Sequence, residues 1–159
     1  MILAYLLLGS NIGNRQENIA HAHQLLNFRC GKIERMSSVY ETAAWGKTDQ
    51  AAFLNQAIEL RTKLQEHDLL IALKNIEQRI GREPGEKWGP RLIDIDILFF
   101  GNLVLDSDTL NIPHPFLHQR RFTLAPLAEL IPSYTHPLLN KTIQELLDQC
   151  PDNAVVKKL

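Results

Sequence analysis

Residues 90–100 read PRLIDIDILFF, and this stretch decides the expected fold more firmly than any other part of the chain. Three isoleucines at 93, 95 and 97 alternate with Asp94 and Asp96. Alternation with a period of two is typical of a strand that buries one face. We therefore predict a strand from Leu92 to Phe100. Its two aspartates would project from the same face, about 6.6 Å apart along the chain.

The aspartate pair predicts a cation site. Two aligned carboxylates repel each other, so they favour either full hydration or a bound cation. The spacing suits a pair of magnesium ions roughly 3.5–4 Å apart that also contact phosphate oxygens. The alternative is a polar outer face on an edge strand. Leu92, Leu98 and Phe100 are expected on the same face as the aspartates, which argues against a face that is simply solvated.

Outward from this strand, the pattern predicts an alternation of strands and helices. The expected strands are Ile2–Leu8, Lys32–Tyr40 and Phe53–Leu60. One helix should run from a cap near Asn14 to about Phe28, and a second should carry Leu69, Leu73, Ile76 and Ile80 and stop at Gly81. Gly101-Asn102 is expected to close a two-residue hairpin into Leu103–Leu105. The C-terminal third should be helical in pieces broken by prolines, ending near Thr142–Cys150.

This element order favours an α+β sandwich built on a largely antiparallel sheet. Two strands follow each other without an intervening helix, which does not fit a doubly wound fold. No repeat, low-complexity tract or linker divides the chain. We expect a single domain over residues 1–159.

Composition excludes several classes of function. The formal net charge is -1, so no global basic field attracts nucleic acid or an anionic membrane. The apolar run Ile2–Leu8 is too short to span a bilayer. Cys30 and Cys150 form no CxxC pair, which fits a reducing compartment. We expect a cytoplasmic, monomeric protein that binds neither nucleic acid nor membrane.

Cationic or aromatic side chains flank the aspartate strand on both sides. Arg82, Lys87, Trp88 and Arg91 precede it. His114, Arg120 and Arg121 follow it. A magnesium-bound polyphosphate needs carboxylates for the metal and cations for its remaining oxygens, and guanidinium groups bind such oxygens bidentately. For any one loop residue, a solvated surface charge is the commoner role.

Other metal and phosphate motifs are weak. His114 and His118 have a spacing that suits zinc on a helix, but prolines enclose His114 and no further ligand completes a tetrahedral set. His21 and His23 lie two apart on a helix and cannot share a face. No GxxxxGK[ST] motif is present. Residues 9–13, GSNIG, could place an anion at a helix N-terminus, although a tight turn is the commoner role.

A planar acceptor is suggested by aromatic residues near an amide. Phe53 and Asn55 share a face of one predicted strand, and Trp45 and Phe122 offer further flat surfaces. Rings stack on such surfaces, and Asn pairs with an adjacent donor and acceptor. Taken singly, each aromatic is more commonly a core residue.

With these motifs assembled, the chain resembles the 6-hydroxymethyl-7,8-dihydropterin pyrophosphokinases from Leu3 to about Pro132. The matching motifs are Gly9-Ser10-Asn11, Phe53-Leu54-Asn55, Glu77 through Arg82, WGPRLIDIDIL at 88–98, Pro113-His114, and Arg120-Arg121-Phe122. Several motifs in the right order make a chance match very improbable. The resemblance implies a three-layer α-β-α sandwich with a ferredoxin-like core. It also implies transfer of the β,γ-diphosphate of ATP to the pterin hydroxymethyl oxygen, with release of AMP, in folate biosynthesis.

The resemblance also implies roles for individual residues. Asp94 and Asp96 would ligate two Mg²⁺ ions, and Arg82, Arg91, His114 and Arg120 would contact the triphosphate. The ATP site would further include Lys74, Glu77, Trp88 and Ile97. The pterin would lie between Phe53 and Phe122, with Thr42 and Asn55 at its polar edge and the backbone near Trp45 closing the pocket. Arg82 and Arg91 join the two aspartates as expected catalytic residues, and the proton acceptor stays open between Asp96 and a metal-bound oxygen.

The chain departs from the family pattern in the loop at 82–91. Many members carry a second arginine two residues after the position of Arg82, where this chain has Pro84. Lys87 is our candidate for the missing charge. Residues 43–52 and 82–90 are candidate lids over the site.

Two other classes of function remain open from the residues alone. A metal-dependent glycosyl- or nucleotidyltransferase could use the same DxD pair, although such enzymes usually need a larger nucleotide-binding domain. A non-catalytic module could keep the pocket and bind MgATP without turnover. The product of the reaction distinguishes the three classes. AMP indicates a pyrophosphokinase, a nucleoside diphosphate or pyrophosphate indicates the other transferase, and binding without any product indicates the module.

Overall fold

A computed structural model describes residues 1–43, 51–81 and 92–159 of the chain. The elements in chain order are β1 (Ile2–Ser10), α1 (Arg15–Arg29), β2 (Lys32–Met36), β3 (Tyr40–Thr42), β4 (Phe53–Thr62), α2 (Glu66–Ile80), β5 (Asp94–Phe100), β6 (Leu105–Asp106), β7 (Asn111–Ile112), the 3₁₀ turn η1 (Leu117–Gln119), α3 (Arg121–Leu130), α4 (Ile143–Asp148) and β8 (Val156–Lys158). None of the helices in these residues is long and apolar enough to cross a membrane.

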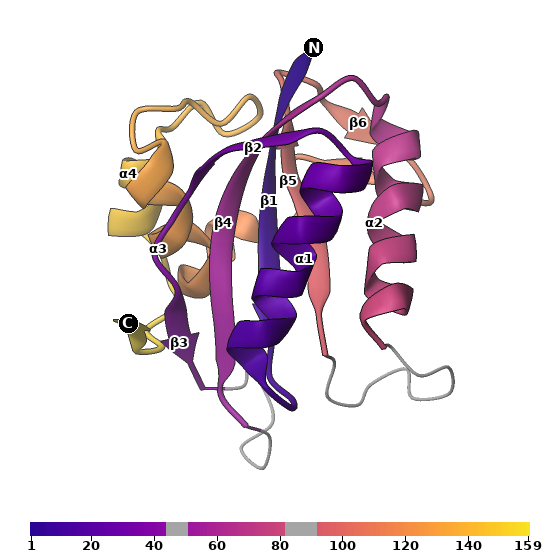
Figure 1. Cartoon of the computed structure of the whole chain (residues 1–159). Coiled ribbons are helices and arrows are strands. Elements are labelled where there is room, and N and C mark those ends of the chain that lie inside the picture. The colour runs from indigo at the N-terminus through magenta and orange to yellow at the C-terminus, as the bar shows by residue number, and fades with distance from the viewer. Residues whose placement is uncertain (44–50, 82–91) are drawn as a thin grey trace.

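The architecture is a sheet covered by helices on both faces (Figure 1). The strands run in the order β5-β1-β4-β3-β8, with β2 also paired to β4, and every pairing is antiparallel. Helices α1 and α2 cover one face, and α3 and α4 cover the other. The predicted α+β class, the antiparallel sheet and the three layers are confirmed.

Each sheet face has its own apolar core. Even-numbered residues of β1 and β4 pack under α1 and α2, among them Leu6, Leu8 and Ile58. Odd-numbered Tyr5 and Leu7 pack under α3 and α4. This alternation follows from the period of two in a strand, and the face under α3 and α4 also carries the polar residues described below.

Helix α1 begins and ends as the sequence predicted, and α2 ends where it was predicted to end. Asn14 caps α1, and its side chain accepts a hydrogen bond from Glu17 N at 3.1 Å. Gly81 ends α2 in the left-handed conformation, with φ +116°. Thr142 and Glu145 form a reciprocal capping box at the start of α4. The last helix ends at Asp148, two residues short of the predicted Cys150.

The prediction of one continuous strand from Lys32 to Tyr40 is wrong. The chain forms two strands, β2 and β3, that pair with β4 in different registers. Ser37 lies in the break, where its N–H donates to Ala57 O and its hydroxyl accepts from Ala57 N at 2.9 Å. A side chain that takes over a ladder hydrogen bond ends regular pairing there.

The predicted hairpin after β5 is also wrong. The chain does turn at Gly101, with φ +53°, but Leu105–Asp106 pairs with Asn111–Ile112 and not with β5. Other groups take the outer edge of β5: the His114 N–H donates to Leu98 O at 3.0 Å, and Glu77 accepts from Ile95 N at 3.0 Å.

Strand β5 starts at Asp94, two residues later than predicted, and its alternation breaks near its end. The pairing with β1 shifts register between Tyr5 and Leu6, so that Tyr5 faces Phe99 while Leu6 faces Ile97. Because this bulge adds a residue, Phe100 packs into the core under α1 and α2. The prediction that Phe100 shares the aspartate face is wrong. The C-terminal strand β8 was not predicted at all.

Candidate active site

The strand register places one predicted metal ligand, Asp94, and one predicted pterin ligand, Asn55, in one row. Gly9 of β1 is the partner of Asp94 on β5 and, on its other side, of Asn55 on β4. Asn55 is in turn the partner of Tyr40 on β3. All four residues belong to the sheet face that α3 and α4 cover. Because neighbouring strands lie about 4.8 Å apart, the backbones at Asp94 and Asn55 are separated by roughly 10 Å.

Gly9 leaves room at the centre of this row. A Cβ built on Gly9 would lie 3.0 Å from the Asn55 side-chain oxygen and 3.8 Å from the Phe53 ring. A Cβ at this position would press on the Asn55 amide and would only touch the Phe53 ring. The requirement here is close approach across the sheet rather than an unusual backbone angle.

Asn55 and Thr42 form a buried polar pair at the β3–β4 end of the row. Their side chains are 4% and 3% exposed, and the Asn55 amide donates to the Thr42 hydroxyl at 3.4 Å. Phe53, the strand partner of Thr42, is partly exposed on the same face. The structure therefore brings together three of the five predicted pterin contacts.

Asp94 and Asp96 are partly buried on the face of β5 that carries this row, while Ile95 between them is 2% exposed and packs in the opposite core. The predicted alternation is confirmed. Among the residues that the structure describes, no group of three or more His, Cys, Asp or Glu side chains converges on one point. Two neighbouring carboxylates suit magnesium, which takes oxygen ligands, including phosphate oxygens, and keeps part of its hydration shell in proteins.

Glu77 of α2 forms a hydrogen bond with the backbone of the strand that carries the two aspartates. It is 1% exposed, its Oε2 accepts from Ile95 N at 3.0 Å, and its Oε1 lies 3.4 Å from Lys74 Nζ. The hydrogen bond holds the peptide between the two aspartates. Ile97 is 4% exposed in the core under α1 and α2, so that only its backbone can reach a ligand at the strand edge.

His114 and Arg120 extend the site beyond β5. Burial lowers the pKa of His114, with Asp96 opposing that shift and Arg120 adding to it. Phe116 N donates to His114 Nδ1 at 3.2 Å, which assigns the hydrogen of the neutral ring to Nε2. The Arg120 guanidinium lies 5.2 Å from the Phe116 ring centre and 5.7 Å from that of Phe122. His114 thus lies close enough to both Asp96 and Arg120 for their charges to affect its pKa.

Several predicted site residues fall outside the described ranges. These are Trp45, Arg82, Lys87, Trp88 and Arg91, and with them most of both candidate lids. Sequence reasoning also missed contacts within the described ranges. Phe116 stacks against Arg120. The sequence offered one indication that Phe116 belongs to the site, its position between His114 and Arg120. The contact between Arg121 and Asp152, 31 residues apart, had no local signal.

Comparison with known proteins places these residues in a family. The family described as 7,8-dihydro-6-hydroxymethylpterin-pyrophosphokinase (HPPK) matches residues 5–132. A 2-amino-4-hydroxy-6-hydroxymethyldihydropteridine pyrophosphokinase of Aquifex aeolicus is 42% identical over 155 residues, which cover 98% of this chain and 94% of the relative. The Bacillus subtilis protein of the same name is 43% identical over 80% of this chain and 77% of its own length.

The domain also occurs within longer proteins. A mitochondrial folate synthesis bifunctional protein of Arabidopsis thaliana is 48% identical over 79% of this chain, which spans only 23% of that protein. The crystal structure of Plasmodium falciparum HPPK-DHPS with pteroate superposes with a TM-score of 0.79 at 20% identity, covering 93% of this chain and 44% of that one. This structural likeness shows a shared fold. With the extent of the sequence matches, the chain belongs to the 7,8-dihydro-6-hydroxymethylpterin-pyrophosphokinase family.

Proposed function

We propose that this chain transfers the β,γ-diphosphate of ATP to the hydroxymethyl group of 6-hydroxymethyl-7,8-dihydropterin and releases AMP, a step in folate biosynthesis. The observation that carries the proposal is the row Asp94–Gly9–Asn55. It places a carboxylate pair and a buried amide–hydroxyl pair on one sheet face. The carboxylate pair suits a metal-bound polyphosphate, and the amide–hydroxyl pair suits the polar edge of a planar ring, so the row can hold the two substrates side by side.

At the β4 end, Asn55 and Thr42 bind the polar edge of the pterin. Phe53 and Phe122 lie against its faces, and the backbone near Trp45 closes the pocket. An amide and a hydroxyl supply both donors and acceptors in a site that excludes water. Such a site rejects rings that lack the matching groups, because its own polar atoms would then stay unpaired.

At the β5 end, Asp94 and Asp96 hold two Mg²⁺ ions on the triphosphate. The ions neutralise phosphate charge when bound. His114 donates from Nε2 to a phosphate oxygen, and Arg82, Arg91 and Arg120 bind further oxygens. Lys74, Glu77, Trp88 and the backbone of Ile97 complete the ATP site. Lys87 supplies the charge that the family's second loop arginine provides.

The reaction then depends mainly on positioning. The pterin hydroxyl oxygen forms a bond to the β-phosphorus, the bond between that phosphorus and the α,β-bridging oxygen breaks, and the hydroxyl proton is released. Holding the two substrates in line converts a bimolecular encounter into an oriented step, and fixed cations stabilise the charge that develops on the phosphates.

An assay of AMP release tests the reaction. Protein, MgATP and hydroxymethyldihydropterin should yield AMP and a pterin diphosphate ester in equal amounts, identified by phosphorus NMR. Asp96→Ala should abolish both products, whereas Asp108→Ala, which changes an exposed aspartate outside the site, should not. Release of ADP or inorganic pyrophosphate would identify a different transferase. Tight binding of MgATP without any product would identify a binding module.

We also propose that residues 1–159 act as a single, monomeric domain in the cytoplasm, without nucleic acid as a partner. Two observations support the single domain: β1 lies inside the sheet, and β8, near the other end of the chain, pairs with β3 of the same sheet. Light scattering of the purified protein should give the mass of one chain, 18.1 kDa. A mass of two chains or more would contradict the monomer.

A further inference from the structure

Residues 152–158 contact both walls of the proposed pterin pocket. One wall begins at the start of α3, next to Arg120 and Phe122. The other is β3, which ends at Thr42. The segment reaches the first wall through Asp152 and the second through β8. No residue of this segment is itself a predicted substrate contact, but its strand β8 is paired with Tyr40 and Thr42 of β3.

Asp152 stabilises the N-terminus of α3. Arg120 occupies the cap position of that helix but makes no capping hydrogen bond with its own side chain. Asp152 Oδ2 accepts from Arg121 N at 3.1 Å, and the Arg121 side chain donates to Asp152 O at 2.9 Å. A carboxylate at this position satisfies a free helical N–H and interacts favourably with the helix dipole.

Strand β8 completes the pairing of β3. Val156 is the partner of Thr42 and Lys157 that of Glu41, and Leu159 N donates to Val39 O at 2.9 Å. Antiparallel partners alternate between hydrogen-bonded and non-hydrogen-bonded pairs. Because the pair 39–159 is hydrogen-bonded, the Lys157 N–H points toward β3 and the Lys158 N–H points away from it. A three-residue strand such as β3 depends on both neighbours for its position.

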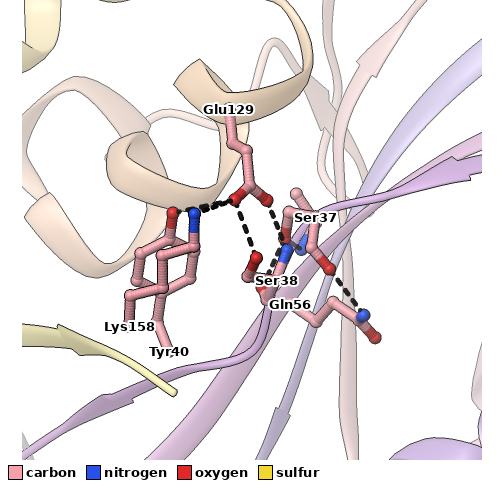
Figure 2. Close-up of polar contacts among 7 residues, drawn as sticks. Ser37, Ser38, Tyr40, Gln56, Glu129 and Lys158 are labelled. Carbon is pink, nitrogen blue, oxygen red and sulfur yellow. Dashed lines mark hydrogen bonds and ion pairs between the residues drawn. The ribbon is translucent and has the colours of Figure 1, made fainter.

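Glu129 of α3 ties β3 and β8 together on the same face (Figure 2). Its carboxylate accepts from the N–H and hydroxyl of Ser38 and lies 3.4 Å from the Tyr40 hydroxyl. It also lies 3.0 Å from Lys158 Nζ. The Lys158 side chain is 60% exposed, so this ion pair contributes little by itself. The backbone pairing of β8 is the stronger link.

We propose that residues 152–158 form a brace that positions the two walls of the pterin pocket, with Asp152 holding the start of α3 and β8 holding β3, which carries Thr42. The inference rests on the proposed function and adds positioning residues to it. Thr42 must stay in register with Phe53 for its hydroxyl to remain within reach of the Asn55 amide. The brace fixes that register from the side of β3 that β4 does not cover.

Proline substitutions at adjacent positions provide a matched test. Lys157→Pro removes an N–H directed at β3, whereas Lys158→Pro removes one directed away from it. Lys158→Ala measures the loss of the ion pair alone. We expect Lys157→Pro to raise KM for the pterin about tenfold while KM for ATP and kcat stay within twofold, since one lost ladder hydrogen bond shifts β3. Lys158→Pro and Lys158→Ala should match the wild type within about twofold.

Asp152 tests the other end of the brace. Because Arg120 and Phe122 flank the contact, Asp152→Ala should raise KM for both ATP and the pterin several-fold. Asp152→Asn, which keeps an acceptor for Arg121 N, should recover most of the loss. The affinity for the fluorescent pterin, measured in the presence of a non-hydrolysable ATP analogue, should be highest for the wild type, slightly lower for Asp152→Asn and lowest for Asp152→Ala.

The outcomes separate the brace from the proposed function. A wild-type protein that releases no AMP refutes the function itself. An active wild type whose Lys157→Pro variant has a lower Tm but the same KM for the pterin as Lys158→Pro refutes the brace, because β8 would then only stabilise the fold. Equal effects of Asp152→Asn and Asp152→Ala would refute the capping role of Asp152.

Discussion

One face of the sheet carries two acidic regions with opposite surroundings. Glu59 of β4 is 7% exposed and is enclosed by donors of its own chain. Tyr5 donates to its Oε2 at 2.7 Å, and Arg35 binds both of its oxygens, at 2.7 and 3.1 Å. Asp94 and Asp96 lie toward the other end of the same face, where β4 carries Asn55.

The difference separates a structural carboxylate from one that is suited to a ligand. Arg35 also donates to Leu130 O at 2.9 Å, so the Glu59 cluster fastens α3 to the sheet and is complete by itself. Within the residues that the structure describes, the Asp96 carboxylate makes no hydrogen bond or ion pair, and His114 is its electrostatic neighbour. A carboxylate in that position stays available for a cation. Substitutions in the two regions should therefore affect different quantities.

The largest expected effect is at Asp96. Asp96→Asn keeps the size of the side chain and removes its charge, and it should lower kcat by at least about a thousandfold, equivalent to about 4 kcal/mol. The free energy of unfolding should change by no more than about 0.5 kcal/mol, because no structural pair is broken. Steady-state kinetics and urea unfolding measure the two quantities, with Asp108→Asn as the control. If Asp96→Asn loses stability but keeps its turnover, Asp96 is a structural carboxylate and not a ligand of the cation.

Asn55 should show the next largest effect, confined to one substrate. Asn55→Ala leaves the Thr42 hydroxyl without its partner and removes the amide from the ring edge. KM for the pterin should rise about a hundredfold, equivalent to about 2.7 kcal/mol, within the range for unpaired buried polar groups. The affinity for MgATP alone should stay unchanged, as isothermal titration can establish. If nucleotide affinity falls equally, the two ends of the row do not bind separate substrates.

Glu59 should respond in stability and not in turnover. Glu59→Gln breaks a buried pair but leaves an arginine that is half exposed, so about 2 kcal/mol of stability should be lost. Glu34→Gln is the matched control, because Glu34 pairs with Arg61 at the surface and should contribute less than about 0.5 kcal/mol. Urea unfolding at neutral pH ranks the two variants, and kcat should stay near the wild-type value in both. Equal stabilities would mean that burial adds nothing to the Glu59 pair.

The same pair predicts a pH dependence. Hydrogen bonds from Arg35 lower the pKa of Glu59 below its ordinary value of 4.5, against the opposing effect of burial. Since the folded state binds this proton more weakly than the unfolded state, the stabilisation is fully present above about pH 4.5 and is lost as the pH falls through the folded pKa. Between pH 5 and 3, wild-type stability should fall more steeply than that of Glu59→Gln. Parallel curves would show that another group controls acid unfolding.

The sequence predicted those parts of the fold that depend on local patterns. Alternation at 93–97, the cap at Asn14 and the stop at Gly81 each use the nearest residues, and each is confirmed. The wrong predictions all involve contacts between distant segments. The hairpin failed because Glu77 and His114 occupy the edge of β5. Strand β8 was missed because its partner lies more than a hundred residues earlier.

The candidate site shows the same division. The residue types and their spacing indicated the aspartate pair and the Phe53–Asn55 face. They gave no sign of how far apart the two groups lie. That distance follows from the pairing of β5, β1 and β4, which sets Gly9 between Asp94 and Asn55. The Glu59 cluster was not predicted either, since Tyr5, Arg35 and Glu59 come from three strands.

Gly9 gives the smallest predicted effect and the finest test of the row. In Gly9→Ala the new methyl group would lie 3.0 Å from the Asn55 oxygen, so the amide must move by a few tenths of an ångström. Crowding of this kind costs about 1 kcal/mol, and KM for the pterin should rise about fivefold. The Asp94 side of Gly9 should be unaffected, which leaves KM for ATP unchanged. The double variant Gly9→Ala/Asn55→Ala isolates the cause, because a methyl group that acts only through the amide adds nothing once the amide is gone. Additive effects in that cycle would place the crowding elsewhere, most directly on Phe53, whose ring lies 3.8 Å from the same methyl position.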